Sequence, residues 1–328
     1  MNITSVITSI NPPNKCTKSV CDSHLVSSLI VVADKKSQDN YCQNNTFYFD
    51  VKAQESSQFS LKNYIPFNHY SRKNLGYLLA IKQGAQYIFD TDDDNFLEEK
   101  GENINNIFKT NKFIKHDTSN QFCNIYSYFT DAFIWPRGFP LDELHKKKNL
   151  NYLLEGNECD VIQYLANGDT DVDSIYRLIF NKEINFKENE SFCLDKNIFS
   201  PTNSQSTFFT KKSFPLLYLP ITVSFRFTDI LRGIVLKNIL DLNDMKLGFK
   251  SPIVYQDRNK HDYMRDFESE VSMFLNVKKV IEILSCLKKS ESIFTDLLNS
   301  YLTLYKNGIV KKEEIISCQT WINDLEKA

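Results

Sequence analysis

Short apolar runs separated by polar turns dominate the first fifty residues. Residues 3–10 (ITSVITSI) are rich in β-branched side chains and stop at the turn-forming residues 11–13 (NPP). Residues 29–33 (LIVVA) form a second apolar run, and residues 47–51 (FYFDV) form a third. Apolar runs of this length, bounded by turn residues, are typical of buried strands. The pattern therefore predicts three strands before residue 55.

A helical pattern follows at residues 71–84 (SRKNLGYLLAIKQG). Four apolar residues recur there at helical spacing: Leu75, Leu78, Leu79 and Ile81. Gly84 is a suitable stop signal, and the apolar run of residues 87–90 (YIFD) comes directly afterwards. This order of strands and helix predicts an α/β fold with a parallel sheet. Ligands of such sheets bind beyond the carboxyl ends of the strands, where the sequence places Asp34 and residues 90–94.

The rest of the chain has a different pattern. Residues 96–260 hold short apolar runs between polar loops, which indicates an α+β half. From about residue 262, apolar residues recur near helical spacing with Lys and Glu between them, which predicts several helices packed on the α/β body.

Composition and charge exclude several classes of protein. Of the 328 residues, 42% are hydrophobic, which is enough for a sizeable core, and the net charge of −2 argues against general nucleic-acid binding. The first fifteen residues lack the pattern of a signal peptide, and no run of about 18 apolar residues predicts a transmembrane helix. The eight cysteines include no CxxC pair, which is typical of reduced thiols. We therefore expect a cytoplasmic protein.

Four carboxylates crowd the end of the fourth apolar run: Asp90, Asp92, Asp93 and Asp94. Like charges this close cost electrostatic energy, which some other group must offset. An acidic turn or a helix cap needs only one or two of them. A divalent cation facing a nucleotide diphosphate explains more, because Mg²⁺ and Mn²⁺ prefer carboxylate oxygens and bridge them to phosphates. The Asp-x-Asp spacing, present at 90/92 and at 92/94, places both side chains of a pair on one side of an extended turn.

A second Asp-x-Asp lies within residues 167–178 (NGDTDVDSIYRL), at Asp171 and Asp173. If Ser174 opens a helix, Asp173 lies at its N-terminus and within one turn of Arg177. One interpretation is an N-capped helix with an ordinary i,i+4 ion pair. The other is a general base, held by its arginine, that deprotonates an acceptor hydroxyl. The local sequence does not decide between them.

Basic residues open the helix at 71–84, where Arg72, Lys73 and Asn74 stand in or near the first turn. Cations there oppose the helix dipole, and this mismatch slightly favours a phosphate or nucleotide role over a solvated turn.

Two later segments also combine charge with apolar residues. Arg226, Asp229 and Arg232 lie near one face of a predicted helix, either as an internal salt-bridge ladder or as an anion clamp. Arg137 lies in residues 135–143 (WPRGFPLDE), where it suits a sugar or phosphate contact and, equally, a packed loop.

Five blocks of the chain, in the same order, resemble the STELLO family of glycosyltransferase-like proteins: RKNLGYLLAIKQGAQYIFDTDDDN, WPRGFPLDE, DTDVDSIYRL, SPTNSQSTFF and LPITVSFRFTDILRG. The combination is far more specific than any Asp-x-Asp alone. The family is related more distantly to the reversibly glycosylated polypeptides, which include UDP-arabinopyranose mutases. The resemblance implies a GT-A fold, in which an α/β sheet and an Asp-rich motif bind a metal ion and a nucleotide-sugar.

The resemblance also implies roles by position. Residues 1–260 would form the catalytic domain, with a nucleotide-sugar-binding half (1–95) and an acceptor half (96–260), followed by the helical region 261–328. The metal ligands would be Asp92 and Asp94. The donor-binding residues would be Asp34, Arg72, Lys73, Asn74, Asp92, Asp93, Arg226 and Arg232. The catalytic residues would be Asp173 or Asp171 as the base, with Arg177 beside it.

We therefore expect a glycosyltransferase that uses Mn²⁺ or Mg²⁺ and a nucleotide-sugar donor, with a UDP-sugar as the first expectation. Its acceptor would be a glycan, a polysaccharide or a lipid-linked glycan. The helical tail offers a surface for a homodimer, and peripheral membrane association stays open. Two alternatives remain: a nucleotide-sugar mutase, for which Arg137 is the candidate glycosyl-accepting arginine, and a non-catalytic scaffold that partners a polysaccharide synthase.

Overall fold

The computed structural model describes residues 2–38, 41, 43–98, 102–115, 121–146, 152–258 and 262–328. The strands are β1 (Ile3–Thr8), β2 (Ser28–Val32), β3 (Thr46–Phe49), β4 (Tyr87–Thr91), β5 (Asn95–Leu97), β6 (Lys109–Thr110), β7 (Lys112–Ile114), β8 (Tyr152–Leu153), β9 (Asn157–Glu158), β10 (Val161–Gly168), β11 (Phe192–Leu194), β12 (Ser206–Thr210) and β13 (Leu247–Gln256). The α-helices are α1 (Lys15–Asp22), α2 (Val51–Ser56), α3 (Lys73–Lys82), α4 (Tyr126–Phe129), α5 (Ser174–Ile179), α6 (Thr228–Leu242), α7 (Tyr263–Ser285), α8 (Ile293–Lys306) and α9 (Lys312–Leu325).

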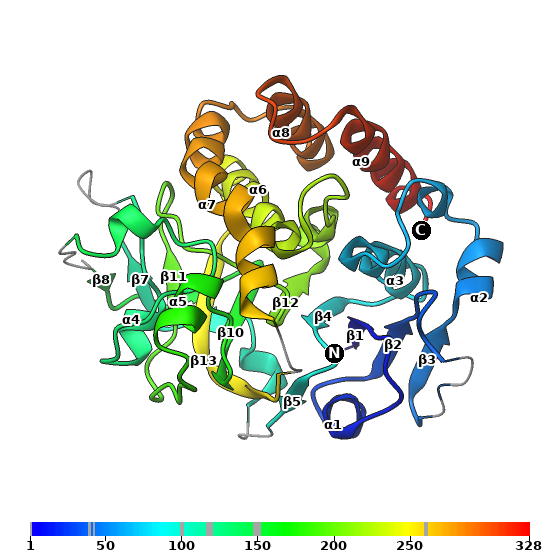
Figure 1. Cartoon of the computed structure of the whole chain (residues 1–328), viewed down its shortest axis with the longest axis horizontal. Coiled ribbons are helices and arrows are strands. Elements are labelled where there is room, and N and C mark those ends of the chain that lie inside the picture. The colour runs from blue at the N-terminus through cyan, green and yellow to red at the C-terminus, as the bar shows by residue number, and fades with distance from the viewer. Residues whose placement is uncertain are drawn as a thin grey trace.

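One large sheet runs through the molecule in the order β3-β2-β1-β4-β12-β10-β13-β11-β7-β8, with β5 paired to β13 (Figure 1). The strands β3, β2, β1 and β4 are parallel to one another, and β10 is parallel to β13. Between these two groups β12 runs antiparallel to both of its neighbours. Most of the paired residues belong to parallel pairs, so the predicted α/β class with a mostly parallel sheet is confirmed. The four predicted strands of the first half correspond to β1, β2, β3 and β4.

The predicted helix at 71–84 is α3, preceded by the short 3₁₀ turn η2 (Tyr70–Arg72). This helix packs directly on β1 and β2 through Gly76. A Cβ atom at that position would lie 2.4 Å from Val32 Cγ2 and 2.6 Å from Val6 Cγ1. The close approach of helix and sheet therefore depends on the missing side chain of glycine.

The C-terminal region is helical, as predicted, and α7, α8 and α9 follow one another along one side of the sheet in Figure 1. Its apolar side chains join the same hydrophobic cluster as residues of β1, β10 and α3. Polar contacts add to this packing: Trp321 Nε1 donates to the carbonyl of Pro215 at 3.1 Å, and the amide of Leu61 donates to Asp324 at 2.7 Å. None of the described helices is both long and apolar enough to cross a membrane.

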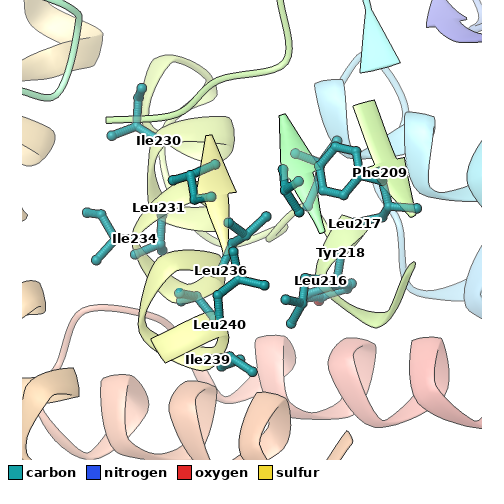
Figure 2. Packing of buried hydrophobic residues seen from close by; sticks show 14 of the residues in the cluster. Phe209, Leu216, Leu217, Tyr218, Ile230, Leu231, Ile234, Leu236, Ile239 and Leu240 are labelled. Carbon is teal, nitrogen blue, oxygen red and sulfur yellow. The ribbon is translucent and has the colours of Figure 1, made fainter. Parts of the chain in front are cut away.

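The helix α6 lies at the centre of the molecule and is buried along most of its length. Its apolar side chains Leu236 and Leu240 project toward Leu216 and Leu217 of the segment after β12 (Figure 2). Burial of a side chain of this size contributes about 1.5–3 kcal/mol. Because α6 is fixed in this way, its first turn is held rigidly at the edge of the sheet where the parallel strands end.

Candidate functional site

A cavity of about 470 Å³ opens at the carboxyl ends of the parallel strands β1, β2, β4, β10 and β13. The antiparallel strand β12 begins at the same edge. Ligands of α/β sheets are expected at this edge. The cavity also has the size of a site for a small organic ligand.

Segments far apart in the sequence line this cavity. The part of the chain before residue 95 supplies Thr8, Ser9, Ile10, Asn11, Val32, Asp34, Lys36, Asn68, His69, Tyr70, Arg72, Asp92, Asp93 and Asp94. The part after residue 95 supplies Arg137, Asp171, Asn203, Gln205, Phe225, Arg226, Asp229, Gln256 and Arg258.

Two buried cations offset the charge at the end of β4. Asp90 is fully buried and contacts Lys73 Nζ at 2.7 Å and Arg232 Nη1 at 2.8 Å, while the hydroxyl of Tyr77 donates to it at 2.7 Å. Burial opposes ionisation of this carboxyl, but the charges of Lys73 and Arg232 prevail and lower its pKa. Lys73 also contacts Asp92 Oδ1 at 3.0 Å. The first-turn lysine thus neutralises the Asp cluster directly.

The three aspartates after β4 have different surroundings. Asp92 Oδ1 accepts the hydroxyl of Tyr70 at 2.6 Å as well as Lys73. Asp93 accepts the side chains of Ser9 and Asn11, at 2.5 and 3.1 Å, and so holds the loop after β1. Asp94 Oδ2 accepts Gln256 Nε2 at 3.2 Å, whereas its Oδ1 is buried with no hydrogen-bond partner in the described part of the chain. Burial, reinforced by the charge of Asp92, raises the pKa of Asp94 to about 7.

The carboxylates fit a cation that binds together with a ligand. Among the described residues, no group of three or more His, Cys, Asp and Glu side chains is placed to hold a metal ion unaided. Asp92 and Asp94 both line the cavity, and Oδ1 of Asp94 has no hydrogen-bond partner among the described residues. Mg²⁺ is commonly held by one or two carboxylates and completes its coordination with phosphate and water oxygens. The donor set therefore suits Mg²⁺ or Mn²⁺ accompanied by a phosphate group.

Asp34 and Arg72 line the cavity on the side of β2. Asp34 accepts the amides of Lys35 and Asn68, both at 2.7 Å, which fixes its carboxylate where β2 ends. Arg72 is buried, lies 4.2 Å from the ring centroid of Phe67 and donates to the side chain of Gln54. Both predicted residues thus line the cavity.

A buried charge network forms the opposite wall around Arg137. Its Nε and Nη2 donate to the two oxygens of Asp171 at 2.8 and 3.0 Å, and its two Nη atoms donate to Asp229 at 3.0 and 2.8 Å. Asn203 donates to Asp171 at 2.8 Å. Although burial acts in the other direction, the charge and hydrogen bonds of Arg137 hold the pKa of Asp171 at about 2.

Asp173 is placed differently from the predicted base. It is fully buried, does not line the cavity, caps α5 by accepting the amide of Tyr176 at 2.9 Å, and accepts Trp135 Nε1 at 2.5 Å. Arg177 forms its ion pair with Asp169, and the expected pairing with Asp173 is absent from the described contacts. The geometry therefore supports the helix-cap interpretation of Asp173 and corrects the pairing assigned to Arg177.

Three of the predicted donor-binding residues lie outside the cavity lining: Lys73, described above, Asn74 and Arg232. Asn74 is buried and exchanges two hydrogen bonds of 2.8 Å with the backbone of Leu219, so it joins α3 to the segment after β12. Arg232 is buried against Asp90 and Ser204. The side chains of Asn74 and Arg232 therefore hold elements of the fold together and do not face the cavity. The sequence could not reveal this, because each partner is more than 25 residues away along the chain.

Sequence reasoning missed two cavity residues at and after the end of β13 and one residue just before Arg226. Gln256 and Arg258 line the cavity, and so does Phe225 in the 3₁₀ turn η6 (Phe225–Phe227). The apolar run of residues 252–256 (PIVYQ), which ends in polar residues, was the signal for another strand whose end reaches the site.

Comparison with known proteins confirms the family resemblance. The family model of the STELLO glycosyltransferases matches residues 226–328. The chain is 24% identical to the probable glycosyltransferase STELLO2 and 23% identical to the probable glycosyltransferase STELLO1, both of Arabidopsis thaliana, over 90% of its own length. The alignment spans 41% of the length of these curated relatives.

Among solved structures, a mycobacterial protein matches with 9% identity and a TM-score of 0.41, over 88% of this chain and 76% of that one. Glucosyl-3-phosphoglycerate synthase from Mycobacterium tuberculosis, solved with Mn²⁺ and UDP-glucose, matches with 10% identity and a TM-score of 0.38, over 88% of this chain and 80% of that one.

Proposed function

We propose that this chain, a relative of the STELLO glycosyltransferases, transfers a sugar from a nucleotide-sugar donor, with a UDP-sugar as the expected class. One observation carries the proposal. Asp34, Asp92 and Asp94 line a single cavity at the carboxyl ends of β2 and β4, and one buried oxygen of Asp94 has no hydrogen-bond partner among the residues that the structure describes. An unpartnered buried carboxylate oxygen is costly, which is accounted for if a ligand completes it.

The donor would lie along the ends of β1, β2 and β4. Asp34, held rigidly by two backbone amides, is placed to accept hydroxyls of the ribose. Asp92 and Asp94 would hold Mn²⁺ or Mg²⁺, which neutralises the charge of a leaving diphosphate when it is bound. Lys73 and Tyr70 orient Asp92 through its Oδ1. Asp93 fixes the loop after β1 by accepting a hydrogen bond from Ser9.

The acceptor would enter from the side of Arg137 and Asp171. Asp171 is the carboxylate of the 167–178 segment that reaches the cavity. A pKa of about 2 keeps it ionised at neutral pH but makes it a weak base. We therefore assign it the role of orienting an acceptor hydroxyl through a hydrogen bond. Asp173 supports this wall by capping α5.

The contacts of Arg137 do not favour the mutase alternative. A nucleophilic arginine needs a guanidinium nitrogen that is free to attack. The Nε and both Nη atoms of Arg137 are engaged by Asp171, Asp229 and the carbonyl of Arg226.

A thermal-shift screen of nucleotide-sugars with Mn²⁺ tests the proposal on three proteins: wild type, Asp94→Ala and Asp131→Ala. Asp131 is a matched control, because its side chain is 90% exposed on the surface. A donor at 100 times its Kd stabilises the folded protein by about 2.7 kcal/mol. We expect this stabilisation in wild type and Asp131→Ala and its loss in Asp94→Ala. Equal stabilisation of all three would refute the role of Asp94, and no response to any nucleotide-sugar would refute the donor class.

A further inference from the structure

We propose that the acceptor carries an oxyanion, a phosphate or a carboxylate group, and that Arg258 binds it with the help of Arg226. This inference rests on the proposed function, since it names the class of acceptor for the same cavity. Neither the family resemblance nor the sequence pattern pointed to Arg258. Its position in the structure is the reason for the assignment.

The guanidinium of Arg258 is buried without the partners that such a group needs. Its side chain is only 4% exposed, and it lines the cavity just after the end of β13. In the described part of the chain, its Nε and Nη2 make no hydrogen bond. The Asp266 carboxylate lies 3.6 Å from Nη2, which is too far for a hydrogen bond. Arg258 therefore brings unsatisfied guanidinium N–H groups to the wall of the cavity.

Neighbouring charges make this arrangement costly in the absence of a ligand. The carboxylates nearby already have arginine partners: Asp171 pairs with Arg137, Asp169 with Arg177, and Glu270 with Arg226. Burial, followed by repulsion from Arg226 and Arg177, lowers the pKa of Arg258. A bound oxyanion would offset both the cost of burial and the repulsion between the arginines, because the planar guanidinium can donate two hydrogen bonds to the oxygens of a phosphate or a carboxylate.

The position of Arg258 assigns the oxyanion to the acceptor. Arg258 and Arg226 come from the part of the chain after residue 95, whereas the proposed donor groups come from the part before it. Gln256, two residues before Arg258, donates to Asp94 at 3.2 Å, so the oxyanion site borders the proposed donor site. A group held there lies next to the sugar that is to be transferred.

Phe225 extends this acceptor side with an apolar surface. It lines the cavity, 54% of its surface is exposed, and its ring stands edge-on to Tyr70 at a centroid distance of 5.7 Å. A flat aromatic ring beside two arginines suits an acceptor with an apolar face and a negative group.

The test measures binding of inorganic phosphate and of acetate by thermal shift and calorimetry, with and without saturating UDP and Mn²⁺. The proteins are wild type, Arg258→Gln, Arg258→Lys and the control Arg265→Gln, whose side chain is 85% exposed on α7. We expect phosphate or acetate to bind wild type and Arg265→Gln saturably, also when UDP is bound. Because hydrogen bonds to charged groups are strong, Arg258→Gln should bind the better probe about ten- to a hundredfold more weakly. Arg258→Lys should keep part of the affinity, which separates loss of the charge from loss of the fold.

Each outcome decides one part of the inference. Equal binding by wild type and Arg258→Gln overturns the oxyanion site. Binding that UDP abolishes assigns Arg258 to the donor and overturns the acceptor role. If UDP itself fails to bind wild type, the proposed function fails, while the phosphate and acetate titrations without UDP still decide the oxyanion site. The better probe identifies the chemical group.

Discussion

The substitution Lys73→Met tests whether this lysine offsets the electrostatic cost of the carboxylates of Asp90 and Asp92. Lys73 and Asp90 are fully buried and 2.7 Å apart, and Asp92 lies 3.0 Å from the same Nζ. Because Arg232 also contacts Asp90, these contacts join two carboxylates to two cations. Methionine fills a similar volume but leaves one carboxylate charge uncompensated.

The expected loss of stability is large for a single change. Removal of one partner of a buried ion pair costs about 3–5 kcal/mol. Unfolding entropy is about 2.1 cal/mol/K per residue, which gives about 0.7 kcal/mol/K for 328 residues. The melting temperature should therefore fall by about 4–7 °C. Urea unfolding followed by tryptophan fluorescence gives the free energy directly.

A second substitution separates charge from packing. Asp92→Asn in the Lys73→Met background leaves the balanced Asp90–Arg232 pair, so the double variant should recover about 0.5–3 kcal/mol as a coupling energy. The control Lys196→Met removes an exposed ion pair with Asp244 and should change stability by less than about 1 kcal/mol. A loss below 1 kcal/mol for Lys73→Met, or a coupling energy of zero, would refute the charge argument.

Three further predictions follow from the site and its supports. Asp94 has a pKa of about 7 and must lose its proton to bind a cation, so Mn²⁺ affinity in the presence of UDP should fall about tenfold from pH 8 to pH 6. Calorimetry at the two pH values checks this prediction, and equal affinities would contradict it. Asp173→Ala should lower the free energy of unfolding by about 2–4 kcal/mol in urea titrations, because it removes a helix cap and the hydrogen-bond partner of Trp135. UDP affinity should stay within twofold of wild type, and a large loss of UDP binding would place Asp173 in the site. Gly233→Ala should lower the free energy of unfolding by about 1–3 kcal/mol, because the Cβ atom of alanine would lie 2.4 Å from the carbonyl oxygen of Thr202. An unchanged melting temperature would contradict this, since it would mean that α6 moves enough to accommodate the methyl group at no cost.

The first part of the fold, up to β4, could be predicted from the sequence because its signals are local. Apolar runs of strand length, a helical repeat and Gly84 lie within ninety residues, and they correspond to β1, β2, β3, α3 and β4. The rule that ligands lie beyond the carboxyl ends of strands pointed to Asp34, Asp92, Asp93 and Asp94, and all four line the cavity, whereas Asp90 is buried below it. The strands after residue 96 were less visible, because several are only two or three residues long and because β11 and β12 run antiparallel to neighbouring strands.

The contacts within the site could not be predicted, because they depend on distant pairings. The cations in the first turn of α3 were interpreted as phosphate ligands. The structure shows Lys73 bound to Asp90 and Asp92, since α3 packs on β1 and β2, and β1 pairs with β4. Likewise, the carboxylate nearest to Arg177 in the helical register is Asp173, but the turn before α5 brings Asp169 to it. Spacing along a helix shows which residues share a face, and it does not show which partner that face meets.

The segment RFTDILRG illustrates the same point and links the two halves of the site. Its three charged residues do not pair with one another: Arg226 binds Glu270 of α7, Asp229 binds Arg137, and Arg232 binds Asp90. One short segment therefore joins Asp90 at the end of β4, the charge network around Arg137 and the C-terminal helices. Since the contacts of Asp229 and Arg232 are buried, a shift of α6 would disturb both walls of the cavity together. This arrangement explains why the C-terminal helices, which line no part of the cavity among the described residues, are expected to matter for the geometry of the site.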